Sequence, residues 1–402
     1  MTARLSGVQT AAAADELDRE IEEVERLFSV GDRAAALVEA RRVAARFPMR
    51  AQSHRAVSNM LTHKNLYLYE TSLREQMVSD GTIHEALASS RMAMRLADRN
   101  FEDFLQAGYC LTALGRYKEA TGLIRTASDM SSLETKPGLF TMMDGSWKPL
   151  IPRFLIIGVM KGGTTSLHRY ISKHAQVLPA VLKEMDYFGF PERGLDWYLA
   201  HFPRRPEWEN RFITGEAFVG NFASPERARL IAEQLPGVKL IAVLRDPTMR
   251  ALSHYYHERK MGIESRSLKD AMNDELDYLD CPPDEMERKL PQYFATQRSY
   301  LYLGLYARHV ELWLQEIPAR NLMIVISEEL NAAPEREVRR VLKHIGLRYQ
   351  SLGDYANVFP GVYDDQPKRD VMERLGRFFA EPNERLFDLI GRRLAWRNGT
   401  EA

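Results

Sequence analysis

One junction, between Phe154 and Ser166, constrains this chain more than any other stretch of it. The first part, Phe154–Val159, is almost entirely apolar and predicts a buried strand. The second part, Lys161–Ser166, contains two glycines that let backbone approach a ligand closely and a Thr/Ser run that we expect to cap a helix. A helix N-terminus offers free N–H groups and partial positive charge, and Lys161 adds a cation. The junction therefore predicts a phosphate-binding loop.

The spacing of this loop differs from that of a Walker A loop. Gly158 and Gly163 are placed as in G-x-x-x-x-G-K-[ST], but Thr164 stands where that motif requires lysine. The nearby lysine, Lys161, comes three residues earlier. A tight strand-to-helix turn that binds nothing is the simpler alternative.

Composition and charge narrow the class of protein. With 402 residues the chain has room for two or three domains, and its 55 basic and 55 acidic residues cancel, so no global basic field favours nucleic acid or an anionic membrane. Two distant cysteines, Cys110 and Cys281, suit a reducing cytosol and provide no metal-binding set. No apolar stretch reaches about 18 residues, the length of a membrane span. We expect a cytoplasmic protein that needs no metal.

The N-terminal part, from about residue 15 to residue 130, shows helical periodicity with few strand signals. Leu114–Ala120 has the L-G-x-x-Y…A pattern of tetratricopeptide repeats, and Leu27–Leu37 has a similar helix–glycine–helix layout. We expect an all-α, helical-repeat-like domain over 1–148, of a kind that often presents a surface to a protein partner or carrier. A non-repetitive helical bundle remains the alternative.

The rest of the chain, 149–402, alternates short apolar runs with helical segments. The expected strands are 154–159, 211–215, 239–244 and 322–326. This alternation predicts an α/β domain in which a parallel sheet is covered by helices on both faces. Ligands of such sheets bind beyond the carboxyl ends of the strands, where the phosphate loop is expected.

A second phosphate-binding pattern follows the strand expected at 239–244. Arg245 ends this strand, and Ser253 comes eight residues later on the next predicted helix. This spacing can bring a guanidinium and a hydroxyl to one phosphate, which arginine binds in a bidentate fork. In the alternative interpretation Asp246 caps the helix, Pro247 begins it and Arg245 lies on the surface.

Carboxylates at two other places are candidates for acceptor chemistry. Glu184 lies in Lys183–Phe188 with Asp186 two residues later, and Glu216 follows the end of the strand expected at 211–215. A carboxylate can take a proton from a hydroxyl if its pKa is raised. Alternatively, Glu184 forms a solvated pair with Lys183, and Glu216 caps a helix.

Taken together, these segments resemble the sulfotransferases that use 3′-phosphoadenosine 5′-phosphosulfate (PAPS). The K-x-G-T-[ST]-x-L loop, the R-D-P-x-x-R-x-x-S-x-Y segment and the K-E-x-x-[FY]-F segment are all present, and the resemblance extends from about residue 151 to residue 396. It is nearest to the heparan sulfate sulfotransferase branch and its bacterial relatives. The resemblance implies a P-loop-like sulfotransferase fold, PAPS as co-substrate and no metal.

The resemblance also implies roles for individual residues. The residues implied to hold the nucleotide are Lys161, Gly162, Gly163, Thr164, Thr165, Ser166, Arg245 and Ser253. Lys161 is further implied to stabilise the leaving phosphate, and Glu184 to accept the proton of the acceptor. Asp186 and Glu216 are the candidates for contact with the acceptor, a hydroxyl or less readily an amine of a carbohydrate, a glycolipid or a natural product.

Some positions depart from the family pattern. Phe218–Asn221 differs from the residues that follow the Gly-Glu pair in relatives, and Gln366–Arg369 lacks the glycine of their K-G-R clamp, so a nucleotide contact by Lys368 or Arg369 stays open. We expect Gly304 near the nucleotide and Trp313 in the core. Two other functions remain as alternatives: a P-loop nucleoside or small-molecule kinase, and a non-catalytic tetratricopeptide adaptor with a nucleotide-sensing domain.

Overall fold

The chain forms two compact units in the computed structural model. The structure describes residues 2–62, 81–96, 100–135, 147–206, 210–279, 299–353, 355 and 369–396. Unit 1 comprises Met1–Leu150 and Pro179–Asn210, and unit 2 comprises Ile151–Leu178 and Arg211–Ala402. Cys281 and Lys368 lie outside the described residues.

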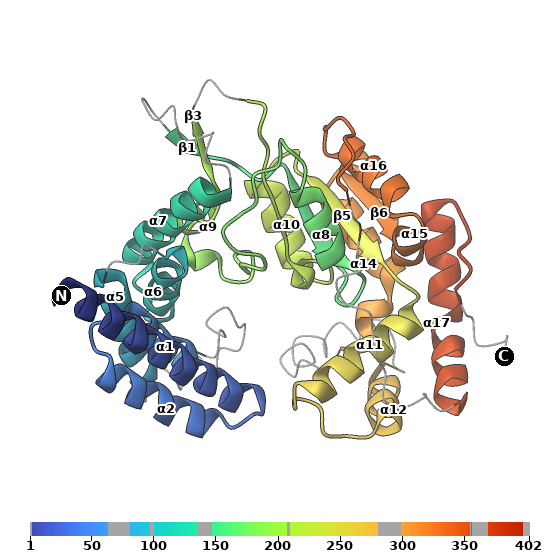
Figure 1. The fold of residues 1–402 in the computed structure, drawn as a ribbon. Helices are drawn as coiled ribbons and strands as arrows, with labels where there is room; N and C mark the ends of the chain where they lie inside the picture. Colours follow the sequence, from blue (N-terminus) through green and yellow to red (C-terminus); the bar gives the residue numbers. More distant parts are fainter. Residues whose placement is uncertain are drawn as a thin grey trace. The chain divides into compact units, whose positions relative to one another are not determined.

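Unit 1 is built mainly from helices that each pack against the next along the chain (Figure 1). They are α1 (Thr2–Ser29), α2 (Arg33–Arg46), α3 (Ala51–Thr62), α5 (Thr82–Arg95), α6 (Phe101–Ala113) and α7 (Tyr117–Thr135). Gly31 and Gly115 adopt φ values of 90° and 72° in the turns between α1 and α2 and between α6 and α7. The predicted all-α N-terminal region is therefore confirmed, whereas its assignment to tetratricopeptide repeats stays a prediction.

A segment that follows the first strand of unit 2 in the sequence packs into unit 1. It contains η2 (Pro191–Arg193), α9 (Leu195–Leu199) and β3 (Arg204–Pro206), which pairs antiparallel with β1 (Trp147–Pro149). Trp197 Nε1 donates to Thr112 Oγ1 at 2.8 Å, and the Tyr109 hydroxyl lies 2.9 Å from His201 Nε2. Because Trp197 and His201 are fully buried, this segment belongs to the core of unit 1.

Unit 2 contains a four-stranded parallel sheet in the order β4-β2-β5-β6. The strands are β2 (Phe154–Gly158), β4 (Gly215–Ala217), β5 (Lys239–Leu244) and β6 (Leu322–Ile326). The predicted α/β architecture is confirmed, and β5 and β6 have the expected bounds. The strand expected at 211–215 is wrong, because β4 begins at Gly215 and the preceding run makes only an isolated bridge between Ile213 and Val177.

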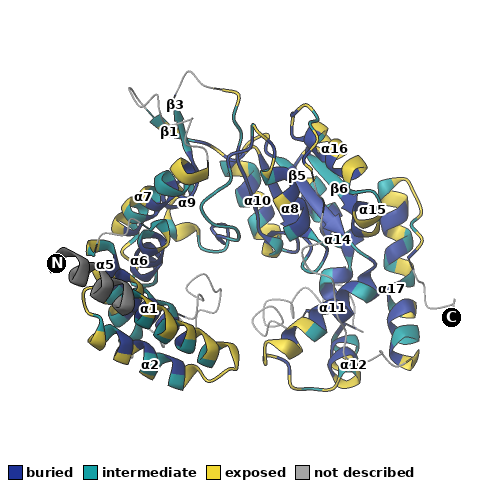
Figure 2. Ribbon diagram, in the orientation of Figure 1, coloured by how far each residue is buried: buried dark blue, intermediate teal, exposed yellow. Residues whose placement is uncertain are grey.

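Helices flank this sheet and bury its apolar residues (Figure 2). On one face α8 (Thr164–Ser172) and α16 (Pro334–His344) pack against alternate strand residues such as Ile156, Ile241 and Val243. The α14 helix (Tyr306–Glu316) packs against α10 (Pro225–Gln234). Its Trp313 is fully buried and donates to the Phe222 carbonyl at 2.9 Å, which confirms the predicted core position.

A second apolar core lies where β5 leads into α11 (Pro247–Lys260). The elements that form it are α11, α12 (Leu268–Leu279), η4 (Tyr302–Gly304) and α17 (Arg369–Ile390). The remaining elements of unit 2 are η3 (Val219–Asn221), η5 (Ala319–Asn321) and α15 (Ser327–Ala332). This second core packs against α11, which follows the carboxyl end of β5.

Candidate functional site

The loop between β2 and α8 packs tightly against the carboxyl end of β5. Val159 N–H donates to the Val243 carbonyl at 3.0 Å. A Cβ atom on Gly162 would lie 2.2 Å from the same carbonyl oxygen, so only glycine fits there. Lys161 adopts a φ of 65°, in the left-handed region. The loop, which follows β2, therefore lies directly against the carboxyl end of β5, and the lack of a side chain at Gly162 permits this contact.

The N-terminus of α8 differs from the expectation that Thr and Ser cap it. Its N-cap residue is Gly163, at φ 99°, and within the described chain no side chain hydrogen-bonds to the cap. Thr164, Thr165 and Ser166 instead form the first helical turn. The predicted side-chain cap is thus wrong, and the N–H groups of this turn keep the arrangement that binds anions at helix N-termini.

Arg245 lies beside this loop, at the junction of β5 and α11. Asp246 is the N-cap of α11 and accepts from Met249 N–H at 3.0 Å, with Pro247 as the first helical residue. The alternative interpretation of Asp246 and Pro247 therefore holds. Arg245 itself is half-buried, and its carbonyl accepts from the Tyr306 hydroxyl at 2.8 Å. Burial, and then the nearby Arg245 charge, lower the pKa of Lys161.

The following turns of α11 bring further polar groups toward Lys161. Arg250 is fully buried and donates to the Tyr300 carbonyl, in agreement with a structural role. Ser253, on the next turn, is 9% exposed. Beyond it His254, His257 and Glu258 all interact electrostatically with Lys161.

Sequence reasoning did not assign Glu258 to the site. The signal that points to it is helical spacing. Glu258 follows His254 by four residues, so these two side chains lie on one face of α11.

Glu184 and Asp186 belong to unit 1, whereas Glu216, Lys161, Arg245 and Ser253 belong to unit 2. Glu184 adopts a φ of 69° and forms an ion pair with Lys183. Asp186 adopts a φ of 46° and is 2% exposed. Non-glycine residues in this region of φ are uncommon and often occur at functional sites.

One further expectation needs correction. Glu216 lies inside β4, paired in register with Leu155 and 2% exposed, so it neither follows the strand nor caps a helix. A Cβ atom on Gly304 would lie 2.7 Å from Phe379 Cε1 and 3.1 Å from Pro247 Cβ. Gly304 therefore allows the close packing of η4 against α17 and α11, and its expected position near the nucleotide stays a prediction.

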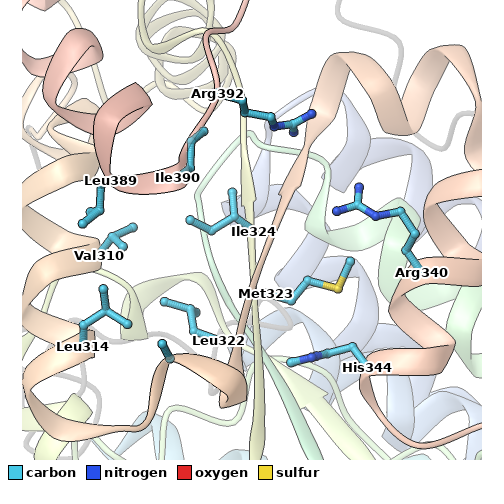
Figure 3. A pocket seen from close by; sticks show the side chains of 11 residues that line it. Val310, Leu314, Leu322, Met323, Ile324, Arg340, His344, Leu389, Ile390 and Arg392 are labelled. Carbon is cyan, nitrogen blue, oxygen red and sulfur yellow. The ribbon is translucent and has the colours of Figure 1, made fainter.

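A separate pocket of about 390 Å³ lies along β6, between α14, α16 and the end of α17 (Figure 3). Its lining is mostly aliphatic, with Arg340, His344 and Arg392 as the basic side chains. Arg340 pairs with Glu337, and Arg392 with Glu329 at 2.8 Å. None of the predicted nucleotide residues lines this pocket, and its charges are largely neutralised.

The site in unit 2 fits an anionic nucleotide. It combines a glycine turn that a Cβ would block, a helix N-terminus without a side-chain cap, a half-buried lysine and a half-buried arginine. Within the described part of the chain, no group of three or more His, Cys, Asp or Glu side chains could hold a metal ion. The fold and the site define an α/β protein that binds phosphate groups at the carboxyl ends of its strands.

Comparison with known proteins identifies the family. The chain matches the family described as "Sulfotransferase domain" over residues 152–359, and it belongs to that family. It is a PAPS-dependent sulfotransferase, with PAPS as co-substrate. This assignment overturns the kinase alternative and the non-catalytic adaptor alternative.

Relatives of known activity include enzymes of heparan sulfate modification. The chain is 33% identical over 273 residues to human heparan sulfate glucosamine 3-O-sulfotransferase 6, covering 65% of this chain and 72% of that protein. It is 30% identical over 204 residues to the human bifunctional heparan sulfate N-deacetylase/N-sulfotransferase 3, covering 49% of this chain and 22% of that much longer protein.

A solved structure is similar as well. The sulfotransferase from Alicyclobacillus acidocaldarius matches with a TM-score of 0.50 and 26% identity, covering 62% of this chain and 99% of that one. Among the described residues, no helix is long and apolar enough to cross a membrane.

Proposed function

We propose that the protein transfers the sulfuryl group of PAPS to a hydroxyl group of a carbohydrate, a glycolipid or a natural product, and less readily to an amine. The observation that carries this proposal is the convergence in unit 2 of the β2–α8 loop, Lys161 and Arg245. The relative named for 3-O-sulfotransfer shares 72% of its length with this chain, which favours a hydroxyl acceptor.

Two clusters of groups would hold the nucleotide. The first-turn N–H groups of α8 and the Lys161 ammonium face one phosphate, at the sulfated end. Arg245 and Ser253, on the strand end and the next helix, provide a guanidinium and a hydroxyl for the 3′-phosphate. We assign the groups to two different phosphates because the loop with Lys161 follows β2, whereas Arg245 and Ser253 follow β5.

Charge stabilisation is the role of Lys161 in this proposal. Bound PAPS supplies an activated sulfuryl group whose transfer leaves negative charge on the oxygen that bridges to its 5′-phosphate. The Lys161 ammonium, half-buried beside the loop, neutralises that charge where water screens it little. The loop contributes by fixing the position of the lysine backbone.

Glu184 accepts the proton of the acceptor in this proposal. Its left-handed backbone lies next to the buried residues Met185 and Asp186, which fix the turn that carries it. Asp186 and Glu216 would contact the acceptor or hold the residues that do.

The N-terminal helical region, over 1–148, is proposed to recognise the acceptor or a protein that carries it. Stacked helices present extended surfaces suited to such recognition. We place the protein in the cytoplasm.

A PAPS-consumption screen over acceptor classes tests this function. Product formation would be followed by mass spectrometry for the gain of one SO3 group, with oligosaccharides, glycolipids, phenolic natural products and amino sugars as acceptors. We expect hydroxyl-bearing acceptors to react without added magnesium. Transfer only to the nitrogen of the amino sugars, or to no class, would contradict the proposed acceptor.

A further inference from the structure

Arg193 is tied to the turn that carries Glu184 and Asp186. Met185 lies between these two residues, whose φ values of 69° and 46° are in the left-handed region. The Met185 carbonyl accepts from Arg193 Nη1 at 3.5 Å. This carbonyl belongs to the peptide plane that joins Met185 to Asp186, so a group that fixes its direction also fixes the backbone beside Glu184.

Two aromatic rings set the direction of the Arg193 guanidinium. Its Cζ lies over the Phe190 ring, 4.2 Å from the centroid, and over the Trp197 ring, 4.9 Å from the centroid. Arginine stacks on aromatic faces through its planar, delocalised charge, which the compact ammonium of lysine lacks. A donor–acceptor distance of 3.5 Å is long for a hydrogen bond, so the contact depends on a donor held in one orientation. The two rings provide that orientation.

The groups that hold Arg193 and the turn are themselves anchored in unit 1. Trp197 is fully buried, and its Nε1 donates to Thr112 Oγ1 of α6 at 2.8 Å. The ring of Tyr187, which follows the turn, stacks on that of Tyr198 in α9 with the centroids 4.8 Å apart. The turn is thus connected to the helices of unit 1 through α9, and Arg193 is a polar part of that connection.

The turn needs such support because its backbone is strained. Non-glycine residues in the left-handed region persist only where the surrounding structure enforces that backbone. Arg193 ends η2, in which Pro191 and Glu192 are exposed whereas Arg193 is half-buried. The arginine is therefore the residue by which this short surface helix contacts the turn.

We propose that Arg193 is a positioning residue: its guanidinium, held by Phe190 and Trp197, fixes the Met185 peptide and thereby holds the Glu184 carboxylate in its reactive direction. This inference rests on the proposed role of Glu184 as proton acceptor. It adds to that role a residue outside the K-E-x-x-[FY]-F segment, and it gives η2 and α9 a part in the chemistry.

Limited proteolysis with trypsin tests the structural step without an acceptor. Trypsin cleaves after Lys183, directly before Glu184, only when the backbone there leaves its folded conformation. In Arg193→Ala this bond should be cleaved several times faster than in wild type, as followed by mass spectrometry. Arg116→Ala is the matched control and should behave as wild type, because Arg116 is an exposed arginine of unit 1 that pairs with Glu119 at 2.6 Å. Unchanged cleavage after Lys183, or cleavage that speeds up equally at all sites of unit 1, would overturn the inference.

The double variant Arg193→Ala/Glu184→Gln tests the catalytic step, with a hydroxyl acceptor that reacts in the PAPS-consumption screen. Arg193→Ala alone should lower kcat about 10–100-fold and leave the affinity for 3′-phosphoadenosine 5′-phosphate unchanged. In the Glu184→Gln background the same change should lower kcat little further, because an amide cannot take the proton wherever it lies. An equal loss in both backgrounds would overturn the inference, since a residue that only stabilises the fold lowers kcat in both.

These outcomes separate the inference from the function on which it rests. If Glu184→Gln keeps its turnover, the proposed proton acceptor fails, whereas a strong loss there with unchanged kcat in Arg193→Ala removes the inference alone. If Arg193→Ala does not fold, Arg193→Lys replaces it in both tests. Lysine keeps the charge but not the planar face, so its effects should be smaller and follow the same pattern. Wild-type cleavage and wild-type kcat in Arg193→Lys would then count against the inference.

Discussion

At the scale of single residues, the β2–α8 loop depends on a contact that excludes side chains. Gly162 has the Val243 carbonyl oxygen 2.2 Å from where a Cβ would lie, and Val243 is fully buried near the carboxyl end of β5. The strand cannot yield, so any side chain at this position must displace the loop. The sequence predicted a glycine-rich loop. It could not show which glycine has no room for a side chain, because that depends on how closely the loop approaches the Val243 carbonyl.

Gly162→Ala should therefore abolish or strongly weaken nucleotide binding while leaving the fold intact. We expect affinity for 3′-phosphoadenosine 5′-phosphate to fall at least tenfold, about 1.4 kcal/mol or more, in calorimetry. Gly122→Ala is the matched control, since Gly122 lies within α7 and has no atom within 4 Å of the place that a Cβ would occupy. That variant should bind normally and unfold at a slightly higher temperature. Equal affinity in the two variants would contradict the proposed loop.

Glu184→Gln tests the proposed proton acceptor. The amide keeps the shape of the side chain but cannot take a proton, so turnover should fall roughly 10²–10⁴-fold with little change in nucleotide affinity. An acceptor with a more acidic hydroxyl should partly restore the activity of Glu184→Gln and should not restore that of Lys161→Ala. Glu192→Gln, an exposed neighbour in η2, is the control. Near-normal turnover in Glu184→Gln would remove it from the reaction.

At the scale of elements, sequence predicted best where two apolar runs pair with each other without interruption. β5 and β6 have their expected bounds and pair in this way over five residues, Leu240–Leu244 with Leu322–Ile326. The strand expected at 211–215 was wrong because hydrophobicity alone does not determine where strand pairing begins. The pairing begins at Gly215, which lies opposite Phe154, and the ring of Phe154 fills the space that a Cβ on Gly215 would need. The packing of α9 against α6 and α7 was also beyond prediction, because it joins segments far apart in the chain.

This packing makes unit 1 sensitive to acid through His201. Burial lowers the pKa of His201 from its ordinary value of 6.5 to about 3. Below pH 6.5 His201 therefore binds a proton in the unfolded state but not in the folded state. The free energy of unfolding decreases as the pH falls, down to about pH 3. At pH 5 this loss amounts to about 2 kcal/mol.

Urea unfolding of wild type and His201→Gln between pH 7.5 and pH 5 measures this effect. The variant should be less stable at pH 7.5, because the bond to the Tyr109 hydroxyl is altered. Its free energy of unfolding should decline less steeply toward pH 5 than that of wild type. Parallel declines would show that His201 titrates normally or is not buried in solution.

At the scale of the whole molecule, the chain order of the two units matters for any attempt to separate them. Unit 1 receives Pro179–Asn210 from within the α/β half of the sequence. Removing the N-terminal helices alone would strip α6 and α7 from this segment and expose Trp197, which is fully buried. A boundary near residue 148 thus separates the sequence but leaves part of the unit 1 core behind.

Two truncated chains test this view. Deletion of residues 1–138 should give an aggregating protein, because the apolar face of α9 loses its cover. A second chain should behave better: residues 151–402 with a short Gly/Ser linker that joins Leu178 to Arg211. The linker can be short because Leu178 N–H donates to the Ile213 carbonyl at 2.9 Å, so the two ends lie close together. We expect this chain to stay monomeric in gel filtration and to bind 3′-phosphoadenosine 5′-phosphate, while sulfuryl transfer is lost with Glu184. If instead the deletion of residues 1–138 gives a monomeric and active protein, the N-terminal helices are not needed for the packing or the chemistry of the segment that holds Glu184.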